Sequence, residues 1–264
     1  MLRGLGMHET AAKIEADPNV LKEEEFNIAK TRVEYANRVV GVVIGIMISW
    51  VLFRSFKFIK TQKSIFIAAL LAWISVVFTG WFGSIVVSTN LTPWTISVHM
   101  SFAFLIVGLL VYTSVKTTPS NQSLNFSMTW LLWICLALLL VQVFLGVKVR
   151  EVLDRVADAL LNDRSSWISG LGTEFFVHRS FSWLIVIVNG YLVYQMSKNN
   201  VSRGLWGALL ALTLASILTG TVMAYASVPA WIQPVHLLLS ALNFGLLLWM
   251  ILMIRQSAVK PTYE

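Results

Sequence analysis

Three of the four histidines lie near one end of long apolar segments, where an imidazole is well placed to bind a metal. His178 and His236 each lie a few residues into such a segment, and both segments run the same way across the membrane inferred below. Two neutral imidazoles at equal depth on two helices can bind opposite faces of one flat cofactor, and haem iron suits this arrangement chemically. The alternative is a pair of interfacial histidines that reach toward water. We weigh a haem-iron site at His178 and His236 against that alternative.

The first half of the chain has one histidine at the equivalent depth. This residue is His99, and Asn37 stands where the second half has His178. Asparagine is not among the side chains that ligate haem iron. We therefore expect two different sites: a six-coordinate one at His178 and His236, and one with an open position at His99. A closed site suits electron transfer, whereas an open one suits a substrate haem or chemistry.

Charged side chains flank these ligand positions. Glu34 and Glu174 precede Asn37 and His178 by three and four residues. A carboxylate near the bilayer is costly without a role, although an acid at a helix start is also favoured by the helix dipole. Arg38 and Arg179 directly follow the ligand positions. They are candidates to bind haem propionates, as arginine binds carboxylates, or else are interfacial charges.

The composition excludes an ordinary soluble domain. Apolar residues make up 57% of the 264 residues and charged residues only 12%, about half the usual share of charge. The net charge of +7 does not indicate nucleic-acid binding, because the basic residues lie in short stretches between long apolar runs. Such a basic excess is typical of the cytoplasmic loops of membrane proteins. The single Cys135 cannot form an internal disulfide.

The apolar runs predict an all-α membrane protein with seven transmembrane helices. A spanning helix needs about 20 mostly apolar residues. The candidates are 36–53, 64–88, 94–115, 127–147, 175–196, 204–226 and 231–254. The connections on one side carry nine Lys and Arg and one acid, whereas the other side carries eleven Lys and Arg and twelve acids. The positive-inside rule places the C-terminus in the cytoplasm and residues 1–35 outside.

Residues 148–163 have an amphipathic pattern of their own. Val149, Leu153 and Val156 recur at helical spacing, and acids and arginines fill the opposite face. The segment predicts a helix at the outer surface of the membrane. It is either an interfacial loop helix or a lid over a site on that side.

Two halves of the chain repeat one pattern. Asn37-Arg38 corresponds to His178-Arg179, 141 residues later, and the segment ending in His99 corresponds to the one ending in His236, 137 residues later. Thr79-Gly80 matches Thr219-Gly220 in this repeat. The repeat predicts two pseudo-symmetric four-helix-bundle halves with the first helix missing. The expected parts are an extracytoplasmic segment 1–35, an N-terminal half 36–126 that contains His99, and a C-terminal half 127–264 that contains His178 and His236.

The motifs resemble those of the haem A synthase family along nearly the whole chain. They are Glu34-Tyr-Ala-Asn37-Arg38-Val-Val-Gly41, Trp81-Phe-Gly-Ser-Ile-Val-Val-Ser88, Val98-His99-Met, Gln142-Val-Phe-Leu-Gly146-Val-Lys-Val-Arg150, Glu174-Phe-Phe-Val-His178-Arg179 and Val235-His236-Leu. Single motifs are weak, but the set in this order and in duplicate is specific. The sequence departs from the family pattern in two places: Asn37 replaces a histidine, and the family's first span is absent.

The resemblance implies a membrane oxidoreductase of haem A biosynthesis that converts haem O to haem A by oxidising a ring methyl to a formyl group. It implies haem b at His178 and His236, haem O as substrate near His99, and Glu34 as the acidic residue of that site. It also implies haem O synthase as a partner, an electron donor that the sequence does not identify, and a place in the bacterial inner (plasma) membrane. Asn37 implies either a five-coordinate substrate haem or lost activity.

Two other classes of protein were weighed. A non-enzymatic or inactive membrane cytochrome b, which binds haem and relays electrons, is favoured by Asn37 and by the missing span. A transporter built from repeats would need broken helices and a charged residue at the midplane, which the spans lack.

Overall fold

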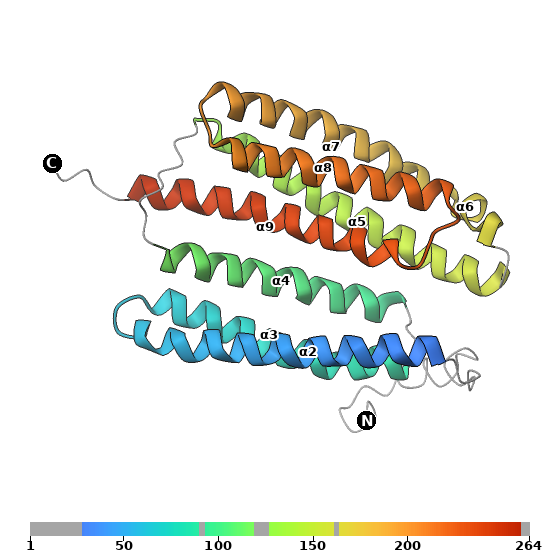
Figure 1. Ribbon diagram of the computed structural model, residues 1–264, viewed down its shortest axis with the longest axis horizontal. Coiled ribbons are helices and arrows are strands. Elements are labelled where there is room, and N and C mark those ends of the chain that lie inside the picture. Colours follow the sequence, from blue (N-terminus) through green and yellow to red (C-terminus); the bar gives the residue numbers. More distant parts are fainter. Residues whose placement is uncertain (1–27, 90–92, 119–126, 161–163, 260–264) are drawn as a thin grey trace. The chain divides into compact units, whose positions relative to one another are not determined.

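The computed structural model describes residues 28–89, 93–118, 127–160 and 164–259, and this part of the chain is helical without a strand (Figure 1). The long helices are α2 (Ile28–Ser55), α3 (Lys63–Ser88), α4 (Pro93–Thr117), α5 (Thr129–Leu160), α7 (Gly172–Lys198), α8 (Arg203–Tyr225) and α9 (Ile232–Val259). Short turns of helix are η2 (Phe56–Phe58), η3 (Arg164–Ser166) and α6 (Trp167–Gly170). Seven helices are long and apolar enough to cross a membrane, which confirms the predicted fold class.

Two predicted boundaries differ from the structure. Helix α2 begins at Ile28, inside the predicted segment 1–35, of which residues 1–27 lie outside the described part. The predicted amphipathic helix 148–163 is not separate, because α5 continues unbroken from Thr129 to Leu160. No proline interrupts α5 after Gly146, and two ion pairs along its surface, Lys148–Glu151 and Arg150–Asp154, stabilise the added turns.

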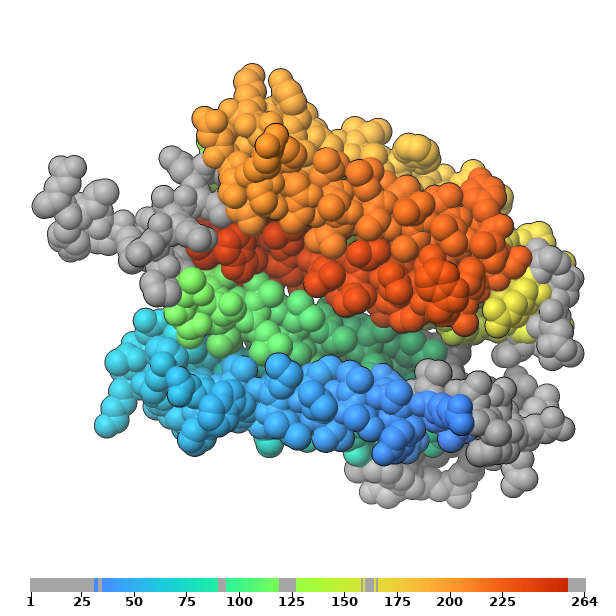
Figure 2. Space-filling view, in the orientation of Figure 1, coloured from blue at the N-terminus to red at the C-terminus, as the bar shows by residue number. Residues whose placement is uncertain are grey.

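The chain divides between Leu109 and Leu110 into two compact units, a first unit of residues 1–109 and a second unit of residues 110–264. In the first unit α2 packs against α3, where the Trp73 indole donates a hydrogen bond to Ser49 over 3.0 Å. Rings join α3 to α4, since Phe78 and Phe102 have centroids 4.5 Å apart. Helix α2 keeps most of its apolar side chains exposed, and its surface is visible along one face in Figure 2. Such exposed apolar surface is expected of a helix that faces lipid.

The second unit is a closed ring of four helices. Helix α5 packs against α7 and α9, and α8 packs against the same two helices. Figure 2 shows the side chains of α8 and α9 meeting along one face of this unit. It follows that α7 and α9 lie diagonally opposite each other, each flanked by α5 and α8.

The apolar core of the second unit is concentrated away from the histidines. The main cluster joins the beginnings of α5 and α8 to the ends of α7 and α9, through residues such as Leu132, Leu192, Leu209 and Met250. A smaller cluster of Leu153, Leu171 and Val228, with Trp167 packed against it, closes the other end, which we call the histidine end. His178 and His236 belong to neither cluster and lie on the turns between them.

Candidate functional site

His178 lies in the second turn of α7 and packs onto α5. A Cβ built at Gly146 of α5 would lie 3.2 Å from Cε1 and 3.7 Å from Nδ1 of His178, so any larger residue there would press on the ring. One turn earlier on α5, the Gln142 amide donates a hydrogen bond to the main-chain oxygen of His178 over 3.2 Å. The glycine lets α5 and α7 approach closely, and the glutamine fixes their register.

His236 lies in the second turn of α9 and packs onto α8 in the same way. A Cβ at Gly220 would lie 3.4 Å from Cε1 of His236. The hydroxyl of Thr219 lies 2.8 Å from Nδ1 of the imidazole, within hydrogen-bond distance. His178 of α7 therefore rests on a glycine of α5, and His236 of α9 rests on a glycine of α8. Of these two histidines, only His236 has a side-chain partner for Nδ1 among the described residues.

The two imidazoles come from diagonally opposite helices, since His178 is on α7 and His236 on α9. Both side chains are half-buried in the second unit. The Nδ1 atom of His178 is buried without a hydrogen-bond partner, and the Nδ1 atom of His236 is turned to Thr219. Since the described contacts of both rings involve Nδ1 and Cε1, Nε2 is the nitrogen available to a ligand. The structure thus brings together the pair that the sequence predicted.

His99 lies in the first unit and repeats only part of this arrangement. A Cβ at Gly83 of α3 would lie 3.7 Å from Cε1 of His99, whose Nδ1 atom is buried and unpartnered. Gly83 is thus the counterpart of Gly220, at the same 137-residue separation as the histidines. The predicted alignment of Thr79-Gly80 with Thr219-Gly220 is therefore wrong, because nothing lies within 4 Å of a Cβ at Gly80. In the corrected register Phe82 takes the place of Thr219.

The other predicted site residues lie in the N-terminal halves of α2 and α7. Asn37 and Arg38 are exposed on α2, and Glu34 belongs to the same helix, although its side chain lies outside the described part. Glu174 is exposed in the first turn of α7. The exposed Arg179 guanidinium lies over the rings of Phe175 and Phe176, 6.0 and 5.8 Å from their centroids. None of these contacts joins them to a histidine.

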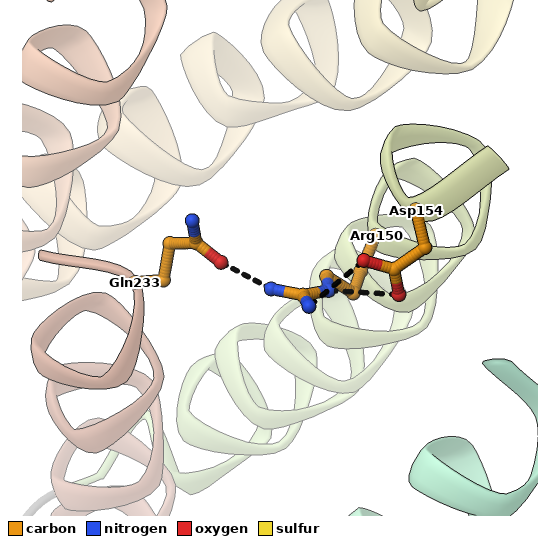
Figure 3. Close-up of polar contacts among 3 residues, drawn as sticks. All are labelled: Arg150, Asp154 and Gln233. Carbon is orange, nitrogen blue, oxygen red and sulfur yellow. Dashed lines mark hydrogen bonds and ion pairs between the residues drawn. The ribbon is translucent and has the colours of Figure 1, made fainter. Parts of the chain in front are cut away.

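A polar network at the histidine end was missed by sequence reasoning. The Arg150 guanidinium binds both carboxylate oxygens of Asp154, at 3.0 and 2.8 Å, and donates a hydrogen bond to the Gln233 side-chain oxygen of α9 (Figure 3). Arg150 is one turn beyond Gly146 on α5, and Gln233 is one turn before His236 on α9. The network therefore joins α5 to α9 one turn away from Gly146 and His236. The motif from Gln142 to Arg150 could have identified Arg150 as a functional residue, but it did not predict that Gln233 is its partner.

The residues of the second unit fit a haem. The described residues contain no group of three or more His, Cys, Asp or Glu that could hold a metal ion by themselves. Two opposed imidazoles suit an iron whose other four ligands come from a porphyrin. Buried polar atoms without partners, Oε1 of Gln142 and Nδ1 of His178, lie in this unit, and such atoms call for an explanation such as a bound group. Gly146 and Gly220 let neighbouring helices approach closely enough for the imidazoles of His178 and His236 to pack on them.

Residues 8–251 match the COX15-CtaA family, described as cytochrome oxidase assembly proteins. The chain is 24% identical over 265 residues to the haem A synthase of Wolbachia pipientis, covering 89% of this chain and 78% of that protein. It is 23% identical over 251 residues to the haem A synthase of Flavobacterium johnsoniae, covering 81% of this chain and 72% of that protein.

A third relative is matched over less of its length. The chain is 23% identical over 195 residues to the haem A synthase of Bartonella tribocorum, which covers 63% of this chain and 53% of that protein. The chain thus spans about half of this relative and about three quarters of the other two. No solved structure matches the chain.

Proposed function

The chain belongs to the COX15-CtaA family of cytochrome oxidase assembly proteins, and from this premise we propose that it acts as a haem A synthase. In this proposal it oxidises a ring methyl of haem O to the formyl group of haem A. The observation that carries the proposal is the pair of imidazoles on diagonally opposite helices, each seated on a glycine. Membership of the family and relatives named haem A synthase support it.

We assign haem b to the second unit, where His178 and His236 would be its axial ligands. A haem with two imidazole ligands supplies one-electron transfer and leaves no open position for a substrate. The protein's own contribution is to orient the two rings. Gly146 and Gly220 set the depth of each imidazole against its neighbouring helix, and Thr219 holds His236 by its Nδ1 atom.

Substrate haem is assigned to the first unit. His99 would hold it, with its ring resting on Gly83 of α3. Asn37 would supply no second imidazole to this haem, so His99 would be the residue that holds it. Glu34, one turn before Asn37 on α2, would stabilise developing positive charge or move a proton during the reaction.

Arg38 and Arg179 are proposed to bind haem propionates, one in each unit. Both are exposed in the N-terminal halves of α2 and α7, and a guanidinium there would pair with a propionate carboxylate. The charge pattern of the loops supports a plasma-membrane location with a cytoplasmic C-terminus. Haem O synthase is proposed as the enzyme that supplies the substrate.

The second candidate function is a membrane cytochrome b that binds haem and relays electrons without converting a pigment. One observation favours it: Asn37 replaces the second imidazole of the first unit and is exposed on α2. This alternative requires only the second unit to bind haem.

Pigment extraction separates the two functions. The chain would be expressed in a host that makes haem O but no haem A, purified, and its extracted haems separated by chromatography. We expect haem A or its hydroxylated precursor together with haem b. Haem b alone would contradict the proposed synthase and support the cytochrome.

A further inference from the structure

We propose that Thr219 is a positioning residue that fixes the ring tautomer of His236, so that Nδ1 carries the proton and Nε2 carries the lone pair for a metal. The inference rests on the proposed haem at this histidine and adds a role for a residue outside the ligand set. A histidine that binds a metal through one nitrogen usually donates its other N–H to an acceptor. Thr219 would be that acceptor.

The surroundings of the Thr219 hydroxyl favour this assignment. Its oxygen lies 2.9 Å from the Ala215 carbonyl, 3.0 Å from the Ser216 carbonyl and 2.8 Å from Nδ1 of His236. A hydroxyl has one proton to donate and two lone pairs to accept with. The carbonyl oxygens can only accept, so they compete for that one proton, which is the usual back-bonding of threonine in a helix. The hydroxyl is then an acceptor toward Nδ1, and the proton between them belongs to the imidazole.

The glycine beside Thr219 brings the ring close to α8. A Cβ at Gly220 would lie 3.4 Å from Cε1 of His236, so the absence of a side chain there lets the ring reach Thr219. Nδ1 of His236 therefore faces an acceptor, and a protonated Nδ1 satisfies it. The opposite tautomer would place a lone pair beside it.

The other two histidines lack this partner. Nδ1 of His178 and Nδ1 of His99 are buried without a hydrogen bond, and Phe82 stands where the repeat would place a threonine for His99. We infer that His236 is the axial ligand whose orientation the protein fixes before haem binds. Donation of the Nδ1 proton also makes the ring more basic and so favours ferric iron.

The test compares three variants of the full chain. Thr219→Val removes the acceptor with little change in size, Thr219→Ser keeps it, and Thr221→Val is the control, because Thr221 is exposed two residues further along α8. We expect Thr219→Val to weaken haem binding about tenfold or more and to raise the reduction potential of the bound haem. Thr219→Ser should restore both values, and Thr221→Val should change neither. A Thr219→Val protein with the affinity and potential of the unmodified chain would overturn the proposal.

A second measurement does not depend on haem. Nitrogen NMR of the protein with labelled histidine, with the His236 signal assigned by its loss in His236→Ala, reads the tautomer directly in haem-free protein. The Nδ1–H tautomer in the unmodified chain, lost in Thr219→Val, supports the proposal. An Nε2–H tautomer overturns it. Failure to bind haem with the expected tautomer present would instead count against the proposed function alone.

Discussion

In both units a histidine packs on a glycine of a neighbouring helix, but the polar groups around that histidine differ. In the second unit, two histidines on opposite helices of a closed ring each rest on a glycine, and one has a hydrogen-bond partner for Nδ1. In the first unit, His99 rests on Gly83 in the same way, but aromatic rings surround its helix pair and Asn37 takes the second histidine's place in the repeat. The shared element is the contact between a histidine and a glycine. What differs is the number of imidazoles and the polarity beside them.

An imidazole ring can therefore pack on a glycine of the neighbouring helix whether its unit contains one histidine or two. A glycine lets an imidazole lie between two close helices whether or not a second imidazole faces it. In the proposed function the second unit holds an electron-transfer haem with two imidazoles, and the first unit holds the substrate haem with one.

The largest effect is expected at His99. His99→Ala should reduce conversion of haem O below detection while leaving haem b in the second unit, and Glu34→Gln should reduce it about a hundredfold. The measurement is the haem A content of extracted pigment, with the haem b content of the same extract as the internal control. Unchanged haem A in His99→Ala would remove the first unit from the reaction.

Adding a methyl group at a histidine–glycine contact of the second unit should weaken haem b binding, and the loss should be larger where the contact is tighter. Gly146→Ala would place Cβ 3.2 Å from the His178 ring, and overpacking of this kind costs about 1–3 kcal/mol. We expect a loss of haem b affinity of roughly tenfold, with a smaller loss for Gly220→Ala. Gly190→Ala is the matched control, because nothing lies within 4 Å of its Cβ. Equal haem titrations for all three variants would contradict the seating role of the glycines.

The two units can be made alike at position 37. Asn37→His supplies the imidazole that the repeat lacks, so we expect the first unit to gain a low-spin haem signal. The absorption spectrum and the haem-to-protein ratio report the change. Asn37→Gln, which adds no imidazole, is the control. A spectrum and a haem content that are the same in Asn37→His as in the unmodified chain would contradict a haem site beside Asn37 in the first unit.

The smallest effect is expected in the network at the histidine end. Arg150→Met should lower the free energy of unfolding by about 1 kcal/mol, because a hydrogen bond to a charged group stabilises by about 1.5–3 kcal/mol when buried and solvent screens this half-exposed side chain. Unfolding by detergent titration measures it. Lys148→Met is the control, because the Lys148–Glu151 pair stays within α5. A larger loss for Lys148→Met would contradict a stabilising tie between α5 and α9.

The sequence predicted the fold, and it placed His178 and His236 at matching depths, for simple physical reasons. Apolar runs of spanning length identify helices, and His178 and His236 share a place relative to those runs. It did not predict where α5 ends, because an amphipathic extension and a separate surface helix have the same periodicity. It also did not predict which glycine meets which ring, because the register of the repeat near Gly80 and Gly83 depends on how α3 and α4 pack. The link from Arg150 to Gln233 joins residues far apart in the chain and has no local signal.

The most direct test of the account is the electron paramagnetic resonance spectrum of the haem-loaded chain and of its single histidine variants. We predict a low-spin ferric signal with two imidazole ligands that is lost in His178→Ala and in His236→Ala and is unchanged in His99→Ala. A low-spin signal that survives His236→Ala, or that disappears in His99→Ala, would contradict the assignment of a closed haem site to the second unit.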